Sequence, residues 1–188
     1  IVQSVDVLSQ IITDPFRLGK IAAIHALSDL YAANATPTTA LAIINLAGAR
    51  QNLQQDQLTQ LLAGGIIALS DSGVKLVGGH TSESSEMSIG YATTGWQYCI
   101  PPPLTLTEPH KLVLSKPLGT GIIMAGHMAH RVDGTVLADA IDVMEHNNHK
   151  AAQIFNKQAG GVAWMTDVTG FGLARHALNL ATRAGFSG

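Results

Sequence analysis

Hydrophobic and polar residues alternate in a way that divides the first half of the chain into strands and two helices. Residues 1–8 alternate with a period of two, which is typical of a half-buried strand. Asp14-Pro15 predicts the start of a helix that runs to about residue 33, because Asp14 can cap the helix and proline suits its first turn. Further along, the pattern predicts a strand over 38–45, a helix over 56–70, and strands over 74–78 and 87–100. This order indicates an α+β fold with both helices on one face of a sheet.

Prolines mark a boundary after the last of these strands. Pro101-Pro102-Pro103 predicts a semi-rigid linker, since proline fixes the backbone and cannot continue a strand ladder. We therefore expect one domain over residues 1–103 and a second over 104–188. In the second part, the pattern predicts a strand at 111–114, helices over 122–131, 136–157 and 170–183, and a short strand ending at Thr166.

The composition excludes several classes of function. Hydrophobic residues make up 46% of the chain and charged residues 13%, so a sizeable core can be buried. No apolar stretch reaches the roughly 18 residues of a membrane-spanning helix, so we expect no membrane partner. The net charge of −2 and the lack of a Lys/Arg cluster argue against binding to nucleic acid. The single cysteine, Cys99, excludes an intrachain disulfide and indicates a reducing compartment, so we expect a buried thiol in a cytoplasmic protein.

Three acidic residues lie in otherwise apolar or glycine-rich surroundings. Asp29 lies late in the first predicted helix, where a buried unpaired charge is costly and an exposed one opposes the helix dipole. Because both placements are unfavourable, we favour a ligand role for Asp29. Asp167 lies between a predicted strand and helix beside Thr169 and Gly170, where a plain N-cap explains one residue but not the neighbouring glycines. Asp6 lies inside a strand, where aspartate is depleted, and a ligand role and an exposed edge position explain it equally well.

Glycines supply the second feature of a phosphate site. Gly78-Gly79-His80 follows a predicted strand, and glycine lets backbone N–H groups approach a phosphate directly. A hairpin turn is nevertheless the better interpretation of these residues alone. Neither a P-loop nor a Rossmann fingerprint occurs in the sequence. Since Mg²⁺ is usually held by one or two carboxylates plus substrate phosphates, carboxylates and glycines together predict a magnesium–polyphosphate site in a nucleotide-using enzyme.

Two pairs of histidines have the spacing of a shared helix face, His127 with His130 and His146 with His149. No cysteine partner or His-Glu-x-x-His pattern accompanies them, which argues against a zinc site. The segment 145–150 instead indicates a solvated helix face.

These features occur in the order and spacing of the selenophosphate synthetase (selenide, water dikinase) family, which the chain resembles over almost its whole length. The family belongs to a larger superfamily of ATP-using enzymes that includes aminoimidazole ribonucleotide synthetase. The matching runs are Ser4-Val5-Asp6, Asp14-Pro15-Phe16, residues 26–32, residues 37–43, Gly78-Gly79-His80, residues 115–121 and residues 166–173.

The resemblance implies two α+β sandwich domains, the first forming a dimeric β-barrel with a second copy and the second truncated here. It implies that ATP binds near the dimer interface in contact with Asp6 and Asp29, and that Asp29 and Asp167 hold Mg²⁺. Gly78-Gly79-His80 would contact ATP, mainly the molecule bound by the other copy. The implied reaction converts selenide, ATP and water to selenophosphate, AMP and phosphate.

The chain departs from the family pattern in three respects. The family's N-terminal segment, which carries a Cys or selenocysteine and a Lys, does not occur in the chain, so the catalytic nucleophile is unassigned. The chain begins mid-strand on Ile1-Val2-Gln3 and ends directly after a helix pattern, so we expect a fragment of a longer polypeptide. Residues 33–36 replace glycines and a lysine that are usual in the family. Two alternatives stay open, another ATP-using enzyme of the superfamily and a non-catalytic dimerisation or regulatory domain.

Overall fold

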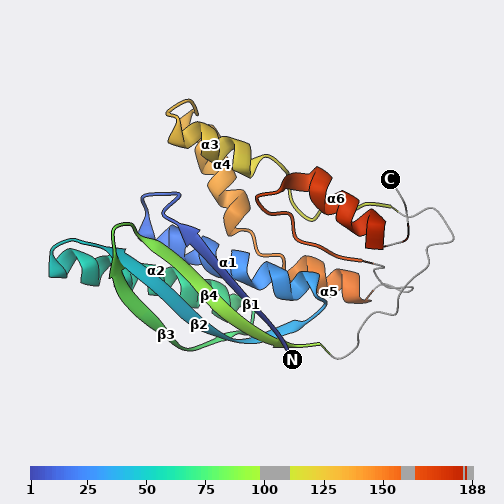
Figure 1. Ribbon diagram of the computed structural model, residues 1–188, viewed down its shortest axis with the longest axis horizontal. Helices are drawn as coiled ribbons and strands as arrows, with labels where there is room; N and C mark the ends of the chain where they lie inside the picture. Colours follow the sequence, from blue (N-terminus) through green and yellow to red (C-terminus); the bar gives the residue numbers. More distant parts are fainter. Residues whose placement is uncertain (98–110, 158–163, 184, 186–188) are drawn as a thin grey trace.

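The computed structural model describes residues 1–97, 111–157, 164–183 and 185. Cys99 and the linker Pro101-Pro102-Pro103 lie outside the described residues, so the boundary at residue 103 stays a prediction. Figure 1 shows a twisted sheet with long helices behind it and a group of shorter helices beyond them.

The first part is a four-stranded sheet covered on one face by two helices. In spatial order the strands run β1-β4-β2-β3; β4 pairs antiparallel with both β1 and β2, and β2 pairs parallel with β3. The elements along the chain are β1 (Val2–Ser9), α1 (Pro15–Ala32), β2 (Thr36–Ala47), α2 (Gln51–Asp71), β3 (Lys75–Ser84) and β4 (Ser88–Trp96). The predicted order of elements and the α+β class are confirmed. Asp14 caps α1 as expected, accepting the backbone N–H of Arg17 at 3.1 Å.

Gly78 and Gly79 lie within a strand, so their interpretation as a turn is wrong. β3 continues through both residues to Ser84, and Gly79 pairs with Ala42 of β2. A Cβ atom at position 79 would lie 2.3 Å from the carbonyl oxygen of Ala42, so the close approach of the two strands requires glycine here.

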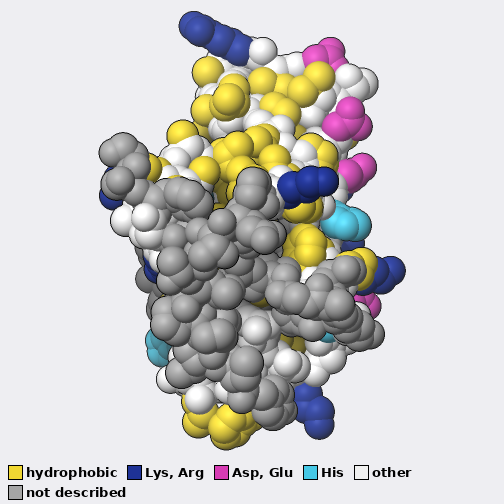
Figure 2. All heavy atoms as spheres, turned by 90° about the vertical axis from the view of Figure 1, so that its right-hand side faces the viewer, with side chains coloured by type: hydrophobic (Ala, Val, Ile, Leu, Met, Phe, Trp, Pro, Cys, Tyr) yellow, Lys and Arg dark blue, Asp and Glu magenta, His cyan; other side chains and the backbone are white. Residues whose placement is uncertain are grey.

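The described residues after 110 form four helices: α3 (Thr120–Met128), α4 (Gly134–Glu145), α5 (His149–Lys157) and α6 (Gly172–Arg183). The strand predicted at 111–114 is wrong, because a strand needs a paired neighbour and none of the described residues supplies one here. The strand predicted up to Thr166 lies partly outside the described residues, and its described part, residues 164–166, is not a strand. A second α+β sandwich is therefore not confirmed. α3 buries only Met124, while Ile122 is 82% exposed. Figure 2, which faces the right-hand side of Figure 1, shows hydrophobic side chains gathered on the upper part of the molecule. In the described part of the chain, no helix combines the length and apolar character needed to cross a bilayer.

The turn between α4 and α5 attaches the second part to the first. We call Asn147-Asn148-His149 the docking turn. Asn147 Nδ2 donates to Ser72 Oγ at 2.7 Å, Asn148 Nδ2 donates to Ser28 Oγ at 3.2 Å, and His149 Nδ1 lies 3.2 Å from Tyr31 OH. The helix predicted over 136–157 is therefore broken, and the interpretation of 145–150 as a solvated face is wrong. Helical spacing alone does not show that another part of the chain covers that face.

Ion pairs add to the docking turn. Arg17 of α1 pairs with Asp142 and Glu145 of α4, and Lys20 Nζ lies 2.9 Å from Glu145 Oε2. Because these groups are partly exposed, each pair adds roughly 1 kcal/mol or less to stability. The ion pairs and the docking turn together connect α1 to the second part at both its first turns and its last turns.

Glycines let the backbones of α1 and α2 come into contact. A Cβ atom at Gly19 would lie 2.0 Å from the carbonyl oxygen of Leu61, and one at Gly64 would lie 1.9 Å from that of Phe16. A side chain at either position would force the helices apart, so these glycines fix where α1 lies over the sheet.

Replacing Gly64 by Ala should lower the free energy of unfolding by at least about 1–3 kcal/mol, the usual cost of overpacking, because α1 must move away from α2. Urea denaturation measures this. Gly48→Ala is the matched control, since its new Cβ would have no atom within 4 Å, and it should change stability by less than about 0.5 kcal/mol. Equal stability of the two variants would show that the helices are not held by this contact.

Candidate functional site

Three carboxylates from separate elements come together beside the C-terminal half of α1. Asp6 lies on β1, on the half-buried face that points toward α1. Asp29 lies in the last turn of α1, and Asp167 lies in the irregular segment 164–169 ahead of α6. The residue patterns single out each of these residues separately, and the family resemblance implies that they share one site. In the structure the three carboxylates interact with one another.

The three carboxylates interact electrostatically. Burial raises the pKa of Asp6, His25 lowers it, and the negative charges of Asp29 and Asp167 raise it further. His25 Nε2 lies 3.9 Å from Asp6 Oδ1. Burial likewise raises the pKa of Asp167, and the charge of Asp29 adds to that rise. Since like charges at close range favour uptake of a proton or a cation, the cluster is suited to bind a cation.

Hydrogen bonds hold Asp29 against the sheet. Ser4 Oγ of β1 donates to Asp29 Oδ2. The buried hydroxyl of Thr93, on the neighbouring strand β4, lies 3.4 Å from the carbonyl oxygen of Ser4 and 3.3 Å from that of Ala26. The strand that carries Asp6 and the helix that carries Asp29 are therefore tied together at the site itself.

Sequence reasoning missed the roles of two side chains beside the carboxylates, Ser4 and His25. Ser4 lies two residues before Asp6, which places both on one face of a strand. His25 lies four residues before Asp29, which places both on one face of a helix. These spacings are the signals that could have found them.

Gly78-Gly79-His80 lies apart from the carboxylates within one chain. β3 and β1 form opposite edges of the sheet. Gly78 and His80 pair with Leu41 and Ile43, which lie on the face of the sheet that points away from α1. A single copy does not bring these residues to the carboxylates, and their ligand role stays a prediction.

The carboxylates suit a cation whose remaining ligands come from a bound phosphate and from water. Among the residues that the structure describes, no group of three or more His, Cys, Asp and Glu side chains is arranged to hold a metal ion by itself. Mg²⁺ is usually held by one or two carboxylates, with phosphate oxygens and waters completing its shell. Asp29 and Asp167, whose mutual repulsion a cation would relieve, fit that requirement.

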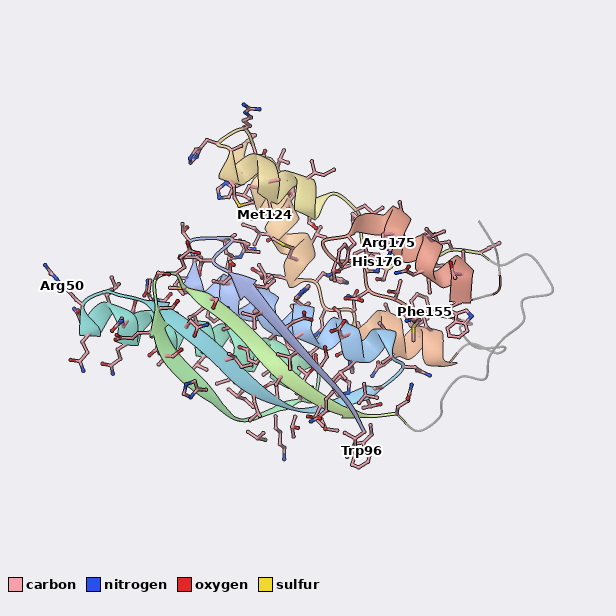
Figure 3. The ribbon with its side chains drawn as sticks, in the orientation of Figure 1. Arg50, Trp96, Met124, Phe155, Arg175 and His176 are labelled. Carbon is pink, nitrogen blue, oxygen red and sulfur yellow. The ribbon has the colours of Figure 1, made fainter. Side chains whose placement is uncertain are left out.

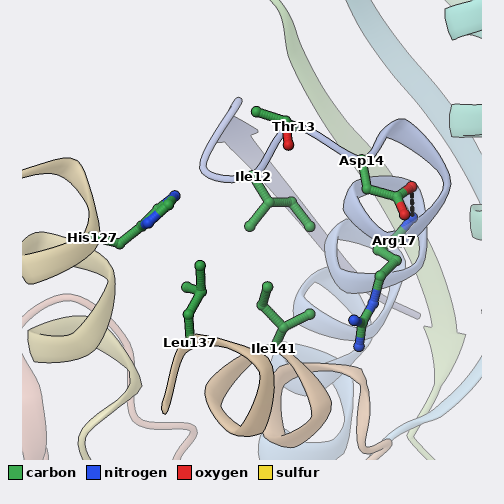
Figure 4. A pocket seen from close by; sticks show the side chains of 7 residues that line it. All are labelled: Ile12, Thr13, Asp14, Arg17, His127, Leu137 and Ile141. Atoms are coloured by element: carbon green, nitrogen blue, oxygen red, sulfur yellow. Dashed lines mark hydrogen bonds between the residues drawn. The ribbon is translucent and has the colours of Figure 1, made fainter. Parts of the chain in front are cut away.

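Two cavities lie elsewhere. One of about 230 Å³ lies between the start of α1 and the helices α3 and α4 (Figure 4). Its charged lining residue Arg17 is already paired with Asp142 and Glu145, and Asp14 caps α1. The other, of about 370 Å³, is lined by Lys116, whose Nζ donates to the carbonyl oxygens of Val143 and His146. His127 also lines the first cavity. Since Arg17, Asp14 and Lys116 already have partners, these cavities offer less free charge than the carboxylates.

Comparison with known proteins identifies the family. The family model described as AIR synthase related protein, N-terminal domain, matches residues 1–97, more than half of the 188 residues. The chain belongs to the AIR synthase related family.

Curated relatives of this AIR synthase related protein are named selenide, water dikinase. The chain is 38% identical to the one from Citrifermentans bemidjiense, over 98% of the chain and 53% of the relative. It is 32% identical to the one from Clostridioides difficile, over 96% of the chain and 51% of the relative. The chain therefore spans about half the length of these relatives. The resemblance to this family is confirmed.

Solved structures share the AIR synthase related fold. E. coli HypE, a hydrogenase maturation protein, matches with a TM-score of 0.74 and 20% identity over 98% of this chain and 59% of that one. Thiamine monophosphate kinase from Aquifex aeolicus matches with a TM-score of 0.73 and 21% identity over 97% and 63%. AaThiL complexed with AMPPCP and TMP matches with a TM-score of 0.70 and 20% identity over 97% and 60%. At these identities the matches show the fold alone.

Replacing Asp29 by Asn should stabilise the ligand-free protein at neutral pH. The amide keeps an oxygen for the Ser4 hydroxyl and removes a charge that raises the pKa of Asp6 and of Asp167. A carboxyl whose pKa is raised by folding binds its proton more tightly in the folded state, so stability falls as pH rises through the folded pKa. In the variant, the free energy of unfolding should fall less between about pH 4 and pH 7, by up to about 1 kcal/mol after solvent screening.

Urea denaturation across that pH range measures the effect. Asp139→Asn, at an exposed carboxylate of α4, is the control and should keep the original pH dependence. If Asp29→Asn also keeps it, the carboxylates do not repel one another in solution.

Proposed function

We propose that the chain is the ATP-using part of a selenide, water dikinase, which converts selenide, ATP and water to selenophosphate, AMP and phosphate. The observation that carries the proposal is the meeting of Asp6, Asp29 and Asp167 in a chain whose curated relatives bear that name. Phosphoryl transfer depends on positioning and charge neutralisation more than on covalent chemistry by the protein. A cation-binding carboxylate cluster supplies the means of charge neutralisation.

Each carboxylate has a distinct role in the proposal. Asp29 and Asp167 would hold Mg²⁺, and Asp6 would contact ATP. Mg²⁺ supplies charge neutralisation at the phosphates when it is bound. Ser4 keeps the carboxylate of Asp29 oriented, and His25 lies beside that of Asp6. ATP as the nucleotide is supported by AaThiL, which has this fold and was solved with AMPPCP.

The outer face of the sheet supports a homodimer. Val5, Val7 and Leu41 are 60%, 48% and 45% exposed on the face opposite to α1 and α2. Exposed large hydrophobic side chains gathered on one face mark interaction surfaces. Pairing through this face would direct Gly78 and His80, which lie on it, toward a nucleotide held by the second copy. A cytoplasmic location and the lack of a nucleic-acid partner stay predictions from composition.

A different ATP-using enzyme of the same fold is the second candidate. HypE and thiamine monophosphate kinase share the fold, and a carboxylate cluster would serve any reaction of a magnesium-bound nucleotide. A non-catalytic dimerisation domain would need the outer sheet face but would not need three carboxylates to meet. Nucleotide binding therefore separates the enzymes from the structural domain.

Calorimetric titration of ATP into the purified chain should show saturable binding that requires Mg²⁺. Asp29→Asn and Asp167→Asn should each weaken that binding about tenfold or more, because a hydrogen bond or metal contact to a charged group contributes about 1.5–3 kcal/mol. Asp139→Asn, exposed and remote on α4, should bind as the original chain does. A lack of Mg²⁺-dependent binding at millimolar ATP would contradict the enzyme proposal for this chain and favour a structural domain.

Replacing Leu41 by Lys should disrupt self-association, because two facing sheets would then bury an unpaired charge. Sedimentation velocity should show the original chain as a dimer and the variant as a monomer. Leu53→Lys on α2 is the matched control, since Leu53 is 49% exposed on a helix that covers the opposite face. A monomeric original chain, or two variants that both remain dimeric, would contradict pairing through the outer face.

A further inference from the structure

The imidazole ring of His176 holds the segment that carries Asp167. His176 lies in the second turn of α6, close to the irregular segment ahead of it (Figure 3). Its Nδ1 lies 3.3 Å from Thr166 Oγ1, and its Nε2 lies 3.3 Å from the backbone nitrogen of Thr169 and 3.4 Å from Thr169 Oγ1. The two threonines lie on either side of Asp167 along the chain, so the ring closes a short loop around it.

The partners of the ring define where its proton lies. A backbone N–H only donates, so Nε2 accepts from Thr169, and the proton of the neutral imidazole then lies on Nδ1. Nδ1 can therefore donate to Thr166 Oγ1, which itself donates to the carbonyl oxygen of Asp167 at 3.0 Å. This run of hydrogen bonds passes from α6 to the backbone of Asp167.

Hydrophobic packing does not account for the position of the His176 ring against residues 164–169. α6 buries none of its described residues, and the neighbouring aromatic residue, Phe171, is 81% exposed. The segment 164–169 belongs to no helix or strand, so it lacks the ladder of backbone hydrogen bonds that holds Asp6 and Asp29. Besides the ring, Gly172 N donates to the carbonyl oxygen of Thr169 at 2.9 Å, which fixes only the end of the segment that meets the helix.

We propose that His176 is a positioning residue for Asp167: it holds residues 166–169 in the conformation that keeps this carboxylate beside Asp29. The inference rests on the proposed function, in which Asp167 holds Mg²⁺. A side chain that orients a metal ligand commonly changes metal affinity by about 10–100-fold when it is removed. A histidine that only stabilised α6 would change the thermal stability without changing the dependence of binding on Mg²⁺.

Three substitutions of His176 separate the contribution of its Nδ1 contact from that of its Nε2 contacts. His176→Ala removes all of them. His176→Gln places an oxygen near the position of Nε2 and keeps an acceptor for Thr169, and His176→Asn keeps a donor near Nδ1 for Thr166. His176→Ala should raise the Mg²⁺ concentration for half-maximal ATP binding about tenfold, while His176→Gln should recover most of the loss. Asn179→Ala, at an exposed position of the same helix, is the matched control and should show no change.

The same titrations with Asp167→Asn distinguish the two proposals. If Asp167→Asn weakens Mg²⁺-dependent binding and His176→Ala does not, the positioning role is wrong and the metal assignment stands. If Asp167→Asn has no effect, the metal assignment fails and the positioning role fails with it.

A second readout needs no nucleotide. Long-range proton–nitrogen NMR correlations should find the ring proton of His176 on Nδ1, and exchange of the Thr169 amide proton should be at least about tenfold faster in His176→Ala than in the original chain. A proton on Nε2, or an amide that exchanges at the same rate in both proteins, would overturn the inference.

Discussion

The backbone contact between α1 and α2 determines where the other elements can lie. Because Gly19 and Gly64 have no side chains, the two helices lie close together while α1 contacts the inner strand β4 and presents its opposite side to the second part. α1 then contacts β1 and β4 on one side and α4 and α5 on the other. Asp29 is carried on this helix, so its distance from Asp6 on β1 and from Asp167 in the second part follows from how closely α1 and α2 pack.

The carboxylate cluster is costly to maintain without a ligand. Burial and mutual repulsion both raise the pKa values of Asp6 and Asp167, so folding makes the charged form of each group less favourable. Neutral donors such as Ser4 and Thr93 fix the elements that carry the charges, and no Lys or Arg partner is found beside the cluster in the described residues. His25 and His176 lower the pKa values of Asp6 and Asp167, but burial and the neighbouring carboxylates outweigh them, so a cation that arrives with a substrate would be stabilised here.

The sequence correctly predicted the elements that depend on residues close together in the chain. The cap at Asp14, the alternation over residues 1–8 and the α+β order of the first part are short-range features, and the structure confirms them. Gly79 misled the prediction because a glycine marks a close approach between strands as readily as a turn. The docking turn and the place of β4 between β1 and β2 depend on contacts between residues far apart in sequence, which periodicity does not encode. Likewise, the local patterns single out Asp6, Asp29 and Asp167 one at a time, and a shared site follows only from the family resemblance and from the fold.

The docking turn has a thermodynamic consequence. Asp6 and Asp29 belong to the first part and Asp167 to the second, so the cluster is complete only while the two parts are held together. Coupling between binding and such an arrangement is reciprocal, because each must favour the other by the same free energy. If a ligand bridges Asp29 and Asp167 as proposed, the three contacts of Asn147-Asn148-His149 supply part of the ordering that the ligand would otherwise have to provide, and so strengthen its binding.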